Sequence, residues 1–556
     1  MRRDLSKLAG HEFDVVIIGG GIFGICTAWE AASRGLSVAL VERGDFAQAA
    51  SANCFKMIHG GIRYLQHADL QRLRASSRER NVLLRIAPHQ TAPLPVVVPT
   101  RGHGRRGRAL LGAAMRLYDL IAGDRNRGIR DPNRRISPGR LVGPRETMEL
   151  FPQLTATDLT GAGIICESQI HNPVRLALCF LHSATQAGAV AANYTEVARF
   201  IHHKGRVLGV DVVDKLGAGT FEVRGRTTLN AAGGWAPHLY RTSFGGDPPS
   251  PMQFSRDLCL VLDRSFNDSY ALAVLTASTD PDALVSRSSR HLLLAPWCGH
   301  TLLGVWHSVM TEHPDRISVA ESEVEACLDE ANAACPGLRL SLDDVTRVQS
   351  GPVLINRSTG KQVRFGTRSH LLDHAEHGID GLLTLVGVRY TVARHDAERV
   401  VDLLFRKLGR EPVPSRTAQT PIFGGAIEDI DRHRQEARTA VRHGIAVACM
   451  DDLALRYGSE HQRVVAFADT DRDLARCLGD SNVLGAEVAH AVREEMAQTL
   501  SDIALRRTEL ATAGAPSDDA LREAAACAAR LLAWDEARVA SEVESVRRSF
   551  AFGQRE

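Results

Sequence analysis

The stretch from Asp14 to Glu42 constrains the fold more than any other part of this chain. It combines a strand rich in Val and Ile, a glycine-rich turn, a helix and a second strand that ends on a carboxylate. A continuous apolar strand is typical of a parallel sheet that is buried on both faces. Gly19, Gly21 and Gly24 have GxGxxG spacing, which in this strand–turn–helix setting indicates dinucleotide binding.

Each residue of this unit has an expected role. We expect Gly19 to allow the tight turn, Gly21 to let the backbone approach a pyrophosphate, and Gly24 to let the helix pack closely on the strand. The phosphates would then lie at a helix N-terminus, where free N–H groups and the helix dipole favour an anion. Glu42 is placed to accept hydrogen bonds from a ribose diol. The alternative is a glycine-rich turn in an ordinary α/β protein.

Composition limits the class of protein. A chain of 556 residues is too long for one core, so we expect two or three domains. A net charge of +2 gives no general attraction to nucleic acid. Eleven scattered cysteines without CxxC or zinc spacing predict reduced thiols and no metal site. A polar N-terminus and the lack of a long apolar run predict a cytoplasmic protein, or one peripheral on the inner face of the cell membrane.

An arginine-rich segment interrupts the first half of the chain. Residues 101–145 contain twelve Arg, three Asp and no Lys or Glu, around the apolar stretch Ala109 to Ala122. It is either a solvated basic face or a peripheral patch for anionic lipid. Further on, Pro412–Val413–Pro414 predicts a domain boundary, with only helices from about Glu428 to the end.

A second motif carries chemically active side chains. Lys56 to Leu65 reads KMIHGGIRYL, a Gly-Gly turn between a Lys-x-x-His pair and an Arg-Tyr pair. Arg63 could make a two-pronged contact with a phosphate or carboxylate, and His59 could handle protons or contact a flavin. The alternative is a tight turn whose Arg and His reach only solvent.

At this motif the chain resembles the FAD-dependent glycerol-3-phosphate dehydrogenases. The resemblance covers nearly the whole chain and continues in YDLIAGDR, NYTEV, LNAAGGWA, GLLTLVGVRYTVAR, LRYGSE and AEVAHAVREEMAQTLSDIALRRTEL. It implies an α/β fold of the D-amino-acid-oxidase superfamily, with a glutathione-reductase-like FAD-binding Rossmann domain, a β-rich substrate domain and an all-helical C-terminal domain. The expected segments are 1–100, 161–245 and 351–411 for the FAD domain, 101–160 for an Arg-rich helical insertion, 246–350 for the substrate domain and 415–556 for the helical domain.

The resemblance also implies functional residues. For FAD binding they are Gly19, Gly21, Gly24, Glu42, Arg43, Ser51, Lys56, His59, Gly60, Gly61, Val197, Ala232, Gly233, Trp235, Gly387, Arg389, Tyr390 and Thr391. The expected catalytic residues are His59, Arg63, Arg389 and His307. The expected substrate contacts are Arg63, Tyr64, Arg368, Trp306 and Cys259.

Several pocket positions depart from the family pattern. Val353 stands where the family has a substrate-binding Arg, and Arg389 where it has a Lys. Cys259 stands in place of a family His, and Trp306–His307 replaces the end of a Gly-Thr-Thr-Asp run. These changes concentrate at positions that contact the substrate in the family, so the resemblance does not identify the substrate of this chain.

Three functions follow as hypotheses. The first is hydride transfer from a small anionic substrate to FAD, with sn-glycerol 3-phosphate giving dihydroxyacetone phosphate. The second is oxidation of a C–N bond in an amine or amino acid, and the third is non-catalytic flavin binding. The electron acceptor is a quinone, oxygen or a soluble carrier, and a homodimer is a candidate assembly.

Overall fold

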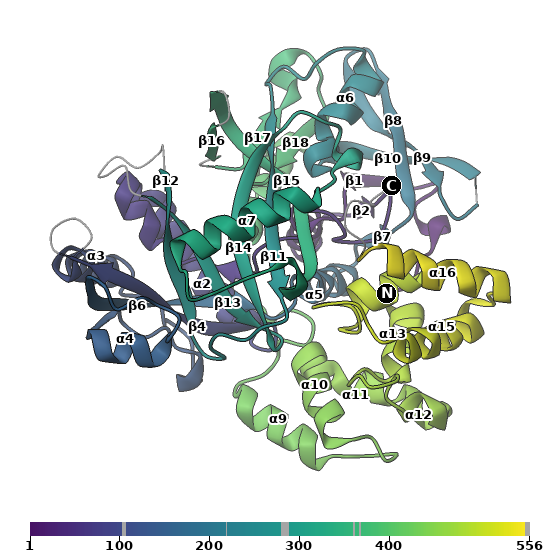
Figure 1. Cartoon of the computed structure of the whole chain (residues 1–556). Helices are drawn as coiled ribbons and strands as arrows, with labels where there is room; N and C mark the ends of the chain where they lie inside the picture. Colours follow the sequence, from purple (N-terminus) through teal and green to yellow (C-terminus); the bar gives the residue numbers. More distant parts are fainter. Residues whose placement is uncertain (103–106, 218, 280–288, 360–361, 366–367, 551–556) are drawn as a thin grey trace.

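The structure is a computed structural model of the chain, and it describes residues 1–102, 107–217, 219–279, 289–359, 362–365 and 368–550. Two large sheets and a group of C-terminal helices make up the molecule (Figure 1). The predicted α/β part, β-rich part and helical C-terminal part are therefore all present.

The first sheet contains the strand that precedes the glycine turn. Its strands β1, β2, β7, β10 and β18 run parallel, while β17, β9 and β8 extend it by antiparallel pairing. In spatial order these strands are β17 (His370–Asp373), β18 (Leu382–Val386), β10 (Gly219–Asn230), β1 (Glu12–Ile18), β2 (Val38–Val41) and β7 (Val190–Ala192), with β9 (Arg206–Asp214) beside β10 and β8 (Thr195–His203) beside β9.

The two faces of β1 pack against different layers, as the two-residue period of a strand requires. Val15 and Ile17 belong to the core shared with α1 (Ile22–Ser33), α5 (Pro173–Gln186) and α8 (Ala393–Lys407). Val16 and Ile18 face the opposite core, which includes residues of β8, β9 and α6 (Ala236–Phe244). Burial on both faces explains the continuous apolar sequence of this strand.

The second sheet forms the β-rich part. Its strand β11 pairs antiparallel with β14 and β15, and α7 (Glu321–Ala334) covers one face of the sheet. In spatial order the strands are β16 (Gln362–Phe365), β15 (Val345–Thr359), β11 (Gln253–Leu262), β14 (His300–Met310), β13 (Ser289–Trp297), β12 (Ala271–Thr279), β4 (Thr91–Arg101), β6 (Leu159–Ile170) and β3 (Met57–Ile58), with β5 (Arg140–Val142) beside β6.

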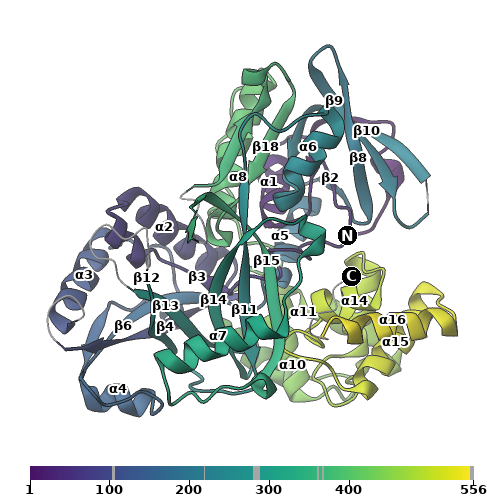
Figure 2. The same cartoon turned by 45° about the horizontal axis from the view of Figure 1, so that its top comes forward.

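The remaining helices fall into two groups on opposite sides of the molecule. In Figure 1 and Figure 2, α3 and α4 lie beside β4 and β6, far from α13, α15 and α16. The first group is α2 (Leu70–Ile86), α3 (Arg108–Ile121) and α4 (Pro144–Leu150). The C-terminal group is α9 (Ile430–Thr439), α10 (Val447–Tyr457), α11 (His461–Val465), α12 (Phe467–Thr470), α13 (Gly485–Glu494), α14 (Leu500–Asp502), α15 (Asp518–Leu532) and α16 (Glu536–Arg548).

Two predicted segment boundaries are wrong. The boundary between residues 350 and 351 falls inside β15, a continuous strand of the second sheet. Residues 91–100 belong to β4 of this sheet and not to the nucleotide-binding sheet. The reason is that β4 and β15 lie wholly in the second sheet, and neither predicted boundary falls at a turn or at a change in composition.

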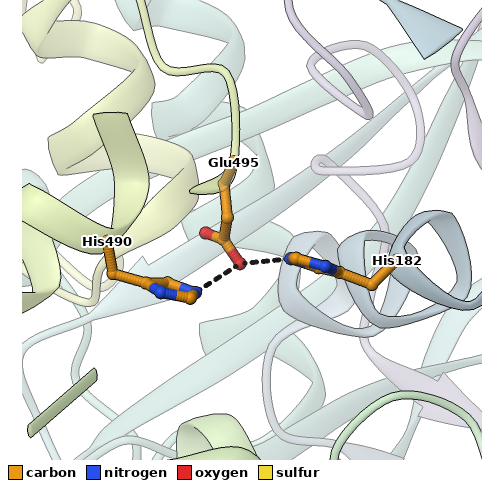
Figure 3. A group of neighbouring side chains, drawn as sticks. All are labelled: His182, His490 and Glu495. Atoms are coloured by element: carbon orange, nitrogen blue, oxygen red, sulfur yellow. Dashed lines mark hydrogen bonds and ion pairs between the residues drawn. The ribbon is translucent and has the colours of Figure 1, made fainter. Parts of the chain in front are cut away.

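A buried charge cluster joins the C-terminal helices to α5. In Figure 3, His182 from α5 and His490 from α13 point toward the carboxylate of Glu495. Their Nε2 atoms lie 3.1 and 3.4 Å from Glu495 Oε1, and Arg175 Nη1 lies 2.6 Å from Oε2. The guanidinium already balances the carboxylate charge, so we interpret this group as an ion pair that fixes the domain interface.

Candidate functional site

At two glycines of the turn after β1, another part of the backbone lies so close that there is no room for a side chain. Gly19 has a φ of +102°, and a Cβ there would lie 2.6 Å from the carbonyl oxygen of Ala231. A Cβ on Gly24 would lie 2.0 Å from the carbonyl oxygen of Gly19. The first glycine therefore permits the turn next to the segment after β10, and Gly24 permits α1 to begin directly against it.

Glu42, at the end of β2, is hydrogen-bonded to the same turn. Its Oε2 accepts from the backbone N–H of Gly20 at 2.7 Å, and its Oε1 accepts from that of Gly44 at 2.9 Å. Burial raises the pKa of this carboxyl group. Each carboxylate oxygen can accept a further hydrogen bond, which a ribose diol could supply.

A cavity of about 580 Å³ is lined in part by this turn, and its volume is within the size range of ligand sites. Gly21 is the N-cap of α1 and gives no side-chain cap to its first amides. A Cβ on Gly21 would find Ser51 Oγ as its nearest atom, at 3.4 Å. The N–H of Ile22 donates to Ser51 Oγ at 3.0 Å. The helix N-terminus, the space at Gly21 and the neighbouring Glu42 carboxylate fit the diphosphate and ribose of a dinucleotide.

Many predicted cofactor residues line this cavity, and others do not. Those in its lining are Gly19, Gly21, Glu42, Arg43, Ser51, Val197, Ala232, Gly233, Trp235, Gly387 and Tyr390. Those outside the lining are Gly24, Lys56, His59, Gly60, Gly61, Arg389 and Thr391.

One side of the cavity carries an ion pair that the motifs did not predict. Asp315 pairs with Arg43 and accepts a hydrogen bond from Trp235 Nε1 at 2.8 Å. The Arg43 guanidinium also lies 4.5 Å from the centre of the Trp235 ring. Hydrogen bonding to Arg43 lowers the pKa of Asp315. Asp315 lies in a short 3₁₀-helix (Pro314–Arg316) far along the chain, so only the fold brings it to Arg43.

His59 and its arginine neighbours form a second cluster. Desolvation by the surrounding protein lowers the pKa of His59, although its side chain is exposed. The charge of Glu167 raises this pKa, and the charges of Arg63, Arg389 and Arg80 lower it. Arg389 Nη1 donates to Tyr64 Oη at 3.2 Å and to Ser76 at 2.7 Å. The cluster combines a neutral imidazole with several cationic donors, which suits proton transfer from an anionic substrate.

Arg368 contacts the start of α2, and Gly60 and Gly61 of the motif are buried. Arg368 Nη2 donates to Gln71 Oε1 at 2.6 Å, near the start of α2. A Cβ on Gly60 would lie 2.1 Å from Tyr118 Oη and 2.3 Å from Arg80 Nη1. Gly60 therefore lets the motif pack on a buried polar group, and Gly61, with a φ of +93°, turns the chain into the following 3₁₀-helix.

The predicted substrate contacts of Cys259 and Trp306 are wrong. Cys259 is fully buried in the core on one face of the second sheet. Trp306 packs on the other face, in the core with α7, and its Nε1 donates to Glu330 at 2.7 Å. Neither lines the cavity, because both point into cores of the sheet that the sequence alone could not locate. His307 is half-buried and lies opposite Asp257 in the pairing of β14 with β11.

Asp257 is a cavity residue that the motifs missed. Its Oδ1 accepts the backbone N–H of Gly351 at 2.9 Å, and burial raises the pKa of its carboxyl group to about 7. The nearby Lys56 donates to the carbonyl oxygen of Cys54 at 2.9 Å, and burial lowers its pKa to about 8. A single acidic residue inside the apolar strand QFSRDLCLVL was the available signal. Val353, also in the lining, gives this side of the cavity an apolar surface.

Comparisons with known proteins agree with this geometry. The family model "FAD dependent oxidoreductase" matches residues 14–394, and "C-terminal domain of alpha-glycerophosphate oxidase" matches residues 415–539. The chain is 28% identical to a glycerol-3-phosphate dehydrogenase of Synechocystis sp. over 520 residues, which cover 92% of this chain and 91% of the relative. It is also 28% identical to the aerobic glycerol-3-phosphate dehydrogenase of Bacillus subtilis, over 91% of this chain and 88% of the relative.

A solved structure shares the fold. The glycerol-3-phosphate dehydrogenase from Bacillus halodurans, complexed with FAD, superposes with a TM-score of 0.75 at 23% identity and covers 98% of this chain and 96% of its own. The family model covers both the glycine turn and the segment around Arg389, which together form the cavity and the cluster described above. This chain therefore belongs to the FAD-dependent oxidoreductase family and is an FAD-dependent enzyme of that family.

Proposed function

We propose that the chain is a dehydrogenase for a small anionic polyol, with sn-glycerol 3-phosphate as the first candidate substrate and dihydroxyacetone phosphate as the product. The observation that carries the proposal is the cluster of His59, Arg63, Tyr64 and Arg389 beside the flavin-binding segments. Two relatives that match this chain over about nine-tenths of their own length are named glycerol-3-phosphate dehydrogenases, and these names support the same substrate.

The proposed roles follow from the side chains. Bound FAD supplies an acceptor for the hydride from the C–H bond of the secondary alcohol. His59, whose lowered pKa favours the neutral imidazole, accepts the hydroxyl proton. Arg63, Arg368 and Arg389 bind the phosphate, because guanidinium groups form two-pronged hydrogen bonds with its oxygens.

An anaerobic titration of the purified holoenzyme tests the proposal. We expect sn-glycerol 3-phosphate to bleach the flavin absorbance within one turnover. The Arg63→Ala variant should retain FAD and raise KM by about 10- to 100-fold, because a charge-assisted hydrogen bond contributes roughly 1.5–3 kcal/mol. Arg432→Ala, which removes an exposed arginine of α9, is the control and should leave KM unchanged. An unchanged KM in the Arg63 variant would contradict the phosphate role.

Oxidation of a C–N bond is the second candidate. Asp257 and Val353 both line the cavity. Binding of a substrate phosphate there would need a cationic side chain, but these two residues supply an acidic and an apolar one. An ionised Asp257 would attract an ammonium group and repel a phosphate. Bleaching by an amine or amino acid, and not by glycerol 3-phosphate, would favour this candidate. No bleaching by a broad panel of both classes would favour a non-catalytic flavin protein.

We also propose a peripheral contact with the inner face of an anionic membrane, with a quinone as electron acceptor. In the described residues, no helix is both long and apolar enough to cross a bilayer. Helix α3 nevertheless exposes Leu110, Leu117 and Leu120, the last of them 79% exposed, and Arg116 lies on the same helix. Exposed leucines beside arginines are typical of a helix that lies in the lipid interface.

A vesicle-pelleting assay tests the membrane contact. The Leu117→Asp, Leu120→Asp double variant should lose most of its binding to vesicles with anionic lipid, because two charges would replace apolar contacts. Leu216→Asp changes a leucine of similar exposure (45%) at the turn between β9 and β10, and it should still pellet. If all three proteins pellet equally, α3 is not the membrane surface. A homodimer stays a prediction, to be measured by light scattering.

A further inference from the structure

Two cysteines of the C-terminal helical domain lie in direct contact. Cys449 is in the first turn of α10, and Cys477 lies between α12 and α13. Their Sγ atoms are 2.8 Å apart, although 28 positions separate them in the chain. A disulfide has a sulfur–sulfur bond of about 2.05 Å, so the two atoms need to approach by less than an ångström. Both residues are free cysteines in this structure.

The backbone holds Cys477 in this position. Cys477 pairs with Leu484 in an isolated antiparallel bridge. The N–H of Leu478 donates to Val483 at 2.8 Å, and the N–H of Gly485 donates to Arg476 at 3.0 Å. The short loop is therefore closed by hydrogen bonds on both sides of Cys477. The thiol meets Cys449 because of the fold and not through chance flexibility of a surface loop.

The two thiols differ in a way that suits a redox pair. Cys449 is fully buried, and burial together with its contact to Cys477 raises the pKa of its thiol to about 12. Cys449 thus keeps its proton and can donate it to the Cys477 sulfur. Cys477 is only half-buried, so it is the sulfur that a small oxidant can reach.

We propose that Cys449 and Cys477 are a redox modification site, which a peroxide converts reversibly into a disulfide. The Cys477 thiolate attacks hydrogen peroxide: an S–O bond forms, the O–O bond breaks and hydroxide leaves, which takes up the proton that the thiol lost and becomes water. The Cys449 sulfur then attacks the sulfenic acid of Cys477, so that the S–S bond forms, the S–O bond breaks and a second water leaves with the Cys449 proton. The two thiols together lose two electrons, and the peroxide gains them.

The disulfide would tighten the C-terminal domain. Helix α10 also carries Arg456, whose guanidinium bonds to Glu487 of α13 at 2.7 Å and to Glu509 at 2.9 Å. A Cys449–Cys477 bond would add a covalent link between α10 and the loop that leads into α13. Closing a loop of this length restricts the unfolded chain more than the folded one.

Thiol counting on the full-length holoenzyme tests this site. The reduced protein is treated with a few equivalents of hydrogen peroxide, unfolded, titrated for free thiols and mapped by mass spectrometry without reduction. We expect the loss of two thiols, a Cys449–Cys477 cross-linked peptide, recovery with dithiothreitol and an increase in Tm of about 5 °C. Retention of all eleven thiols, or a cross-link between other cysteines, would overturn the proposal.

Two variants separate this pair from general thiol oxidation. Cys298→Ser removes an exposed cysteine and should still lose two thiols through the same cross-link. Cys449→Ser should form no cross-link and should instead retain a sulfenic acid at Cys477, which dimedone labels. A cross-link that persists in Cys449→Ser would contradict the assignment of the partner. Because the wild-type measurement needs no substitution, poor folding of a variant would leave the main test intact.

Discussion

The Gly24→Ala variant is expected to be purified without FAD. The added Cβ would lie 2.0 Å from the Gly19 carbonyl oxygen and 3.4 Å from Ile17 Cγ2. A backbone atom cannot move aside as a side chain can, so α1 must shift away from β1 and open the turn. Overpacking of this kind costs roughly 1–3 kcal/mol or more, which corresponds to a loss of at least about 10- to 100-fold in FAD affinity.

The ratio of flavin to protein absorbance after purification measures this effect, and circular dichroism reports whether the variant is folded. Gly143→Ala is the matched control, since a Cβ there would find no atom within 4 Å and its φ is −78°. The control should keep its FAD. A folded Gly24→Ala protein with a full complement of FAD would show that close packing at Gly24 is not needed for binding.

Asp45→Asn is expected to destabilise the protein by about 3–5 kcal/mol, because it removes one partner of a buried ion pair. The Asp45 carboxylate is fully buried and accepts from Arg507 Nη1 and Nη2 at 2.7 and 2.6 Å and from Arg506 Nε at 2.6 Å. It follows Glu42 by three residues, so this contact joins the nucleotide-binding loop to the C-terminal domain. The Asn variant leaves the buried Arg507 guanidinium without its carboxylate, while Arg506 keeps its ion pair with Asp502.

The same carboxylate predicts how stability depends on pH. Burial opposes ionisation of Asp45, but Arg507 and Arg506 outweigh it and lower the pKa to about 2 from an ordinary value of 3.8. The folded state therefore binds this proton less tightly than the unfolded state. Its contribution to stability is complete above pH 3.8 and is lost as the pH falls toward 2. The Asn variant should lack this part of the pH dependence.

Chemical unfolding of the two proteins between pH 7 and about pH 2 measures both effects. Glu149→Gln is the control, because Glu149 pairs with Arg145 on the surface, where both side chains are more than half exposed. Surface pairs of this kind contribute roughly 0–1 kcal/mol. If Asp45→Asn changed the free energy of unfolding no more than this control does, the buried pair would not hold the domains together.

The site could be predicted from sequence where its residues are close together in the chain. Three parts of the site are local sequence patterns: the turn from Gly19 to Gly24, the acidic end of β2 and the motif from Lys56 to Tyr64. Such patterns can be recognised without knowing the fold, because their residues are close together in the chain. The family resemblance added the distant segment around Arg389. In the structure Arg389 Nη1 donates to Tyr64 Oη at 3.2 Å, and their shared role in one site stays a prediction.

The positions that failed depend on which face of a strand a side chain occupies. Trp306 was predicted as a substrate contact, but it lies on the face that α7 covers. A shift of one residue reverses the face of every side chain in a strand, and a sequence without its strand register does not show which face is buried. For the same reason Asp257 was missed, although it lies in the cavity lining.

Local spacing in the sequence predicted a dinucleotide site and the cationic second motif, because each depends on residues within a few turns of chain. The resemblance to a family over nearly the whole chain then narrowed the dinucleotide to FAD and implied the three types of domain. Only the tertiary structure decided which cavity wall holds Asp257 and how Asp45 joins Arg507 across 462 positions. It also brought Cys449 to Cys477. Such contacts depend on packing between helices and strands that are distant in the chain. The free energy that favours them comes from burying the apolar faces of these elements and not from any local motif.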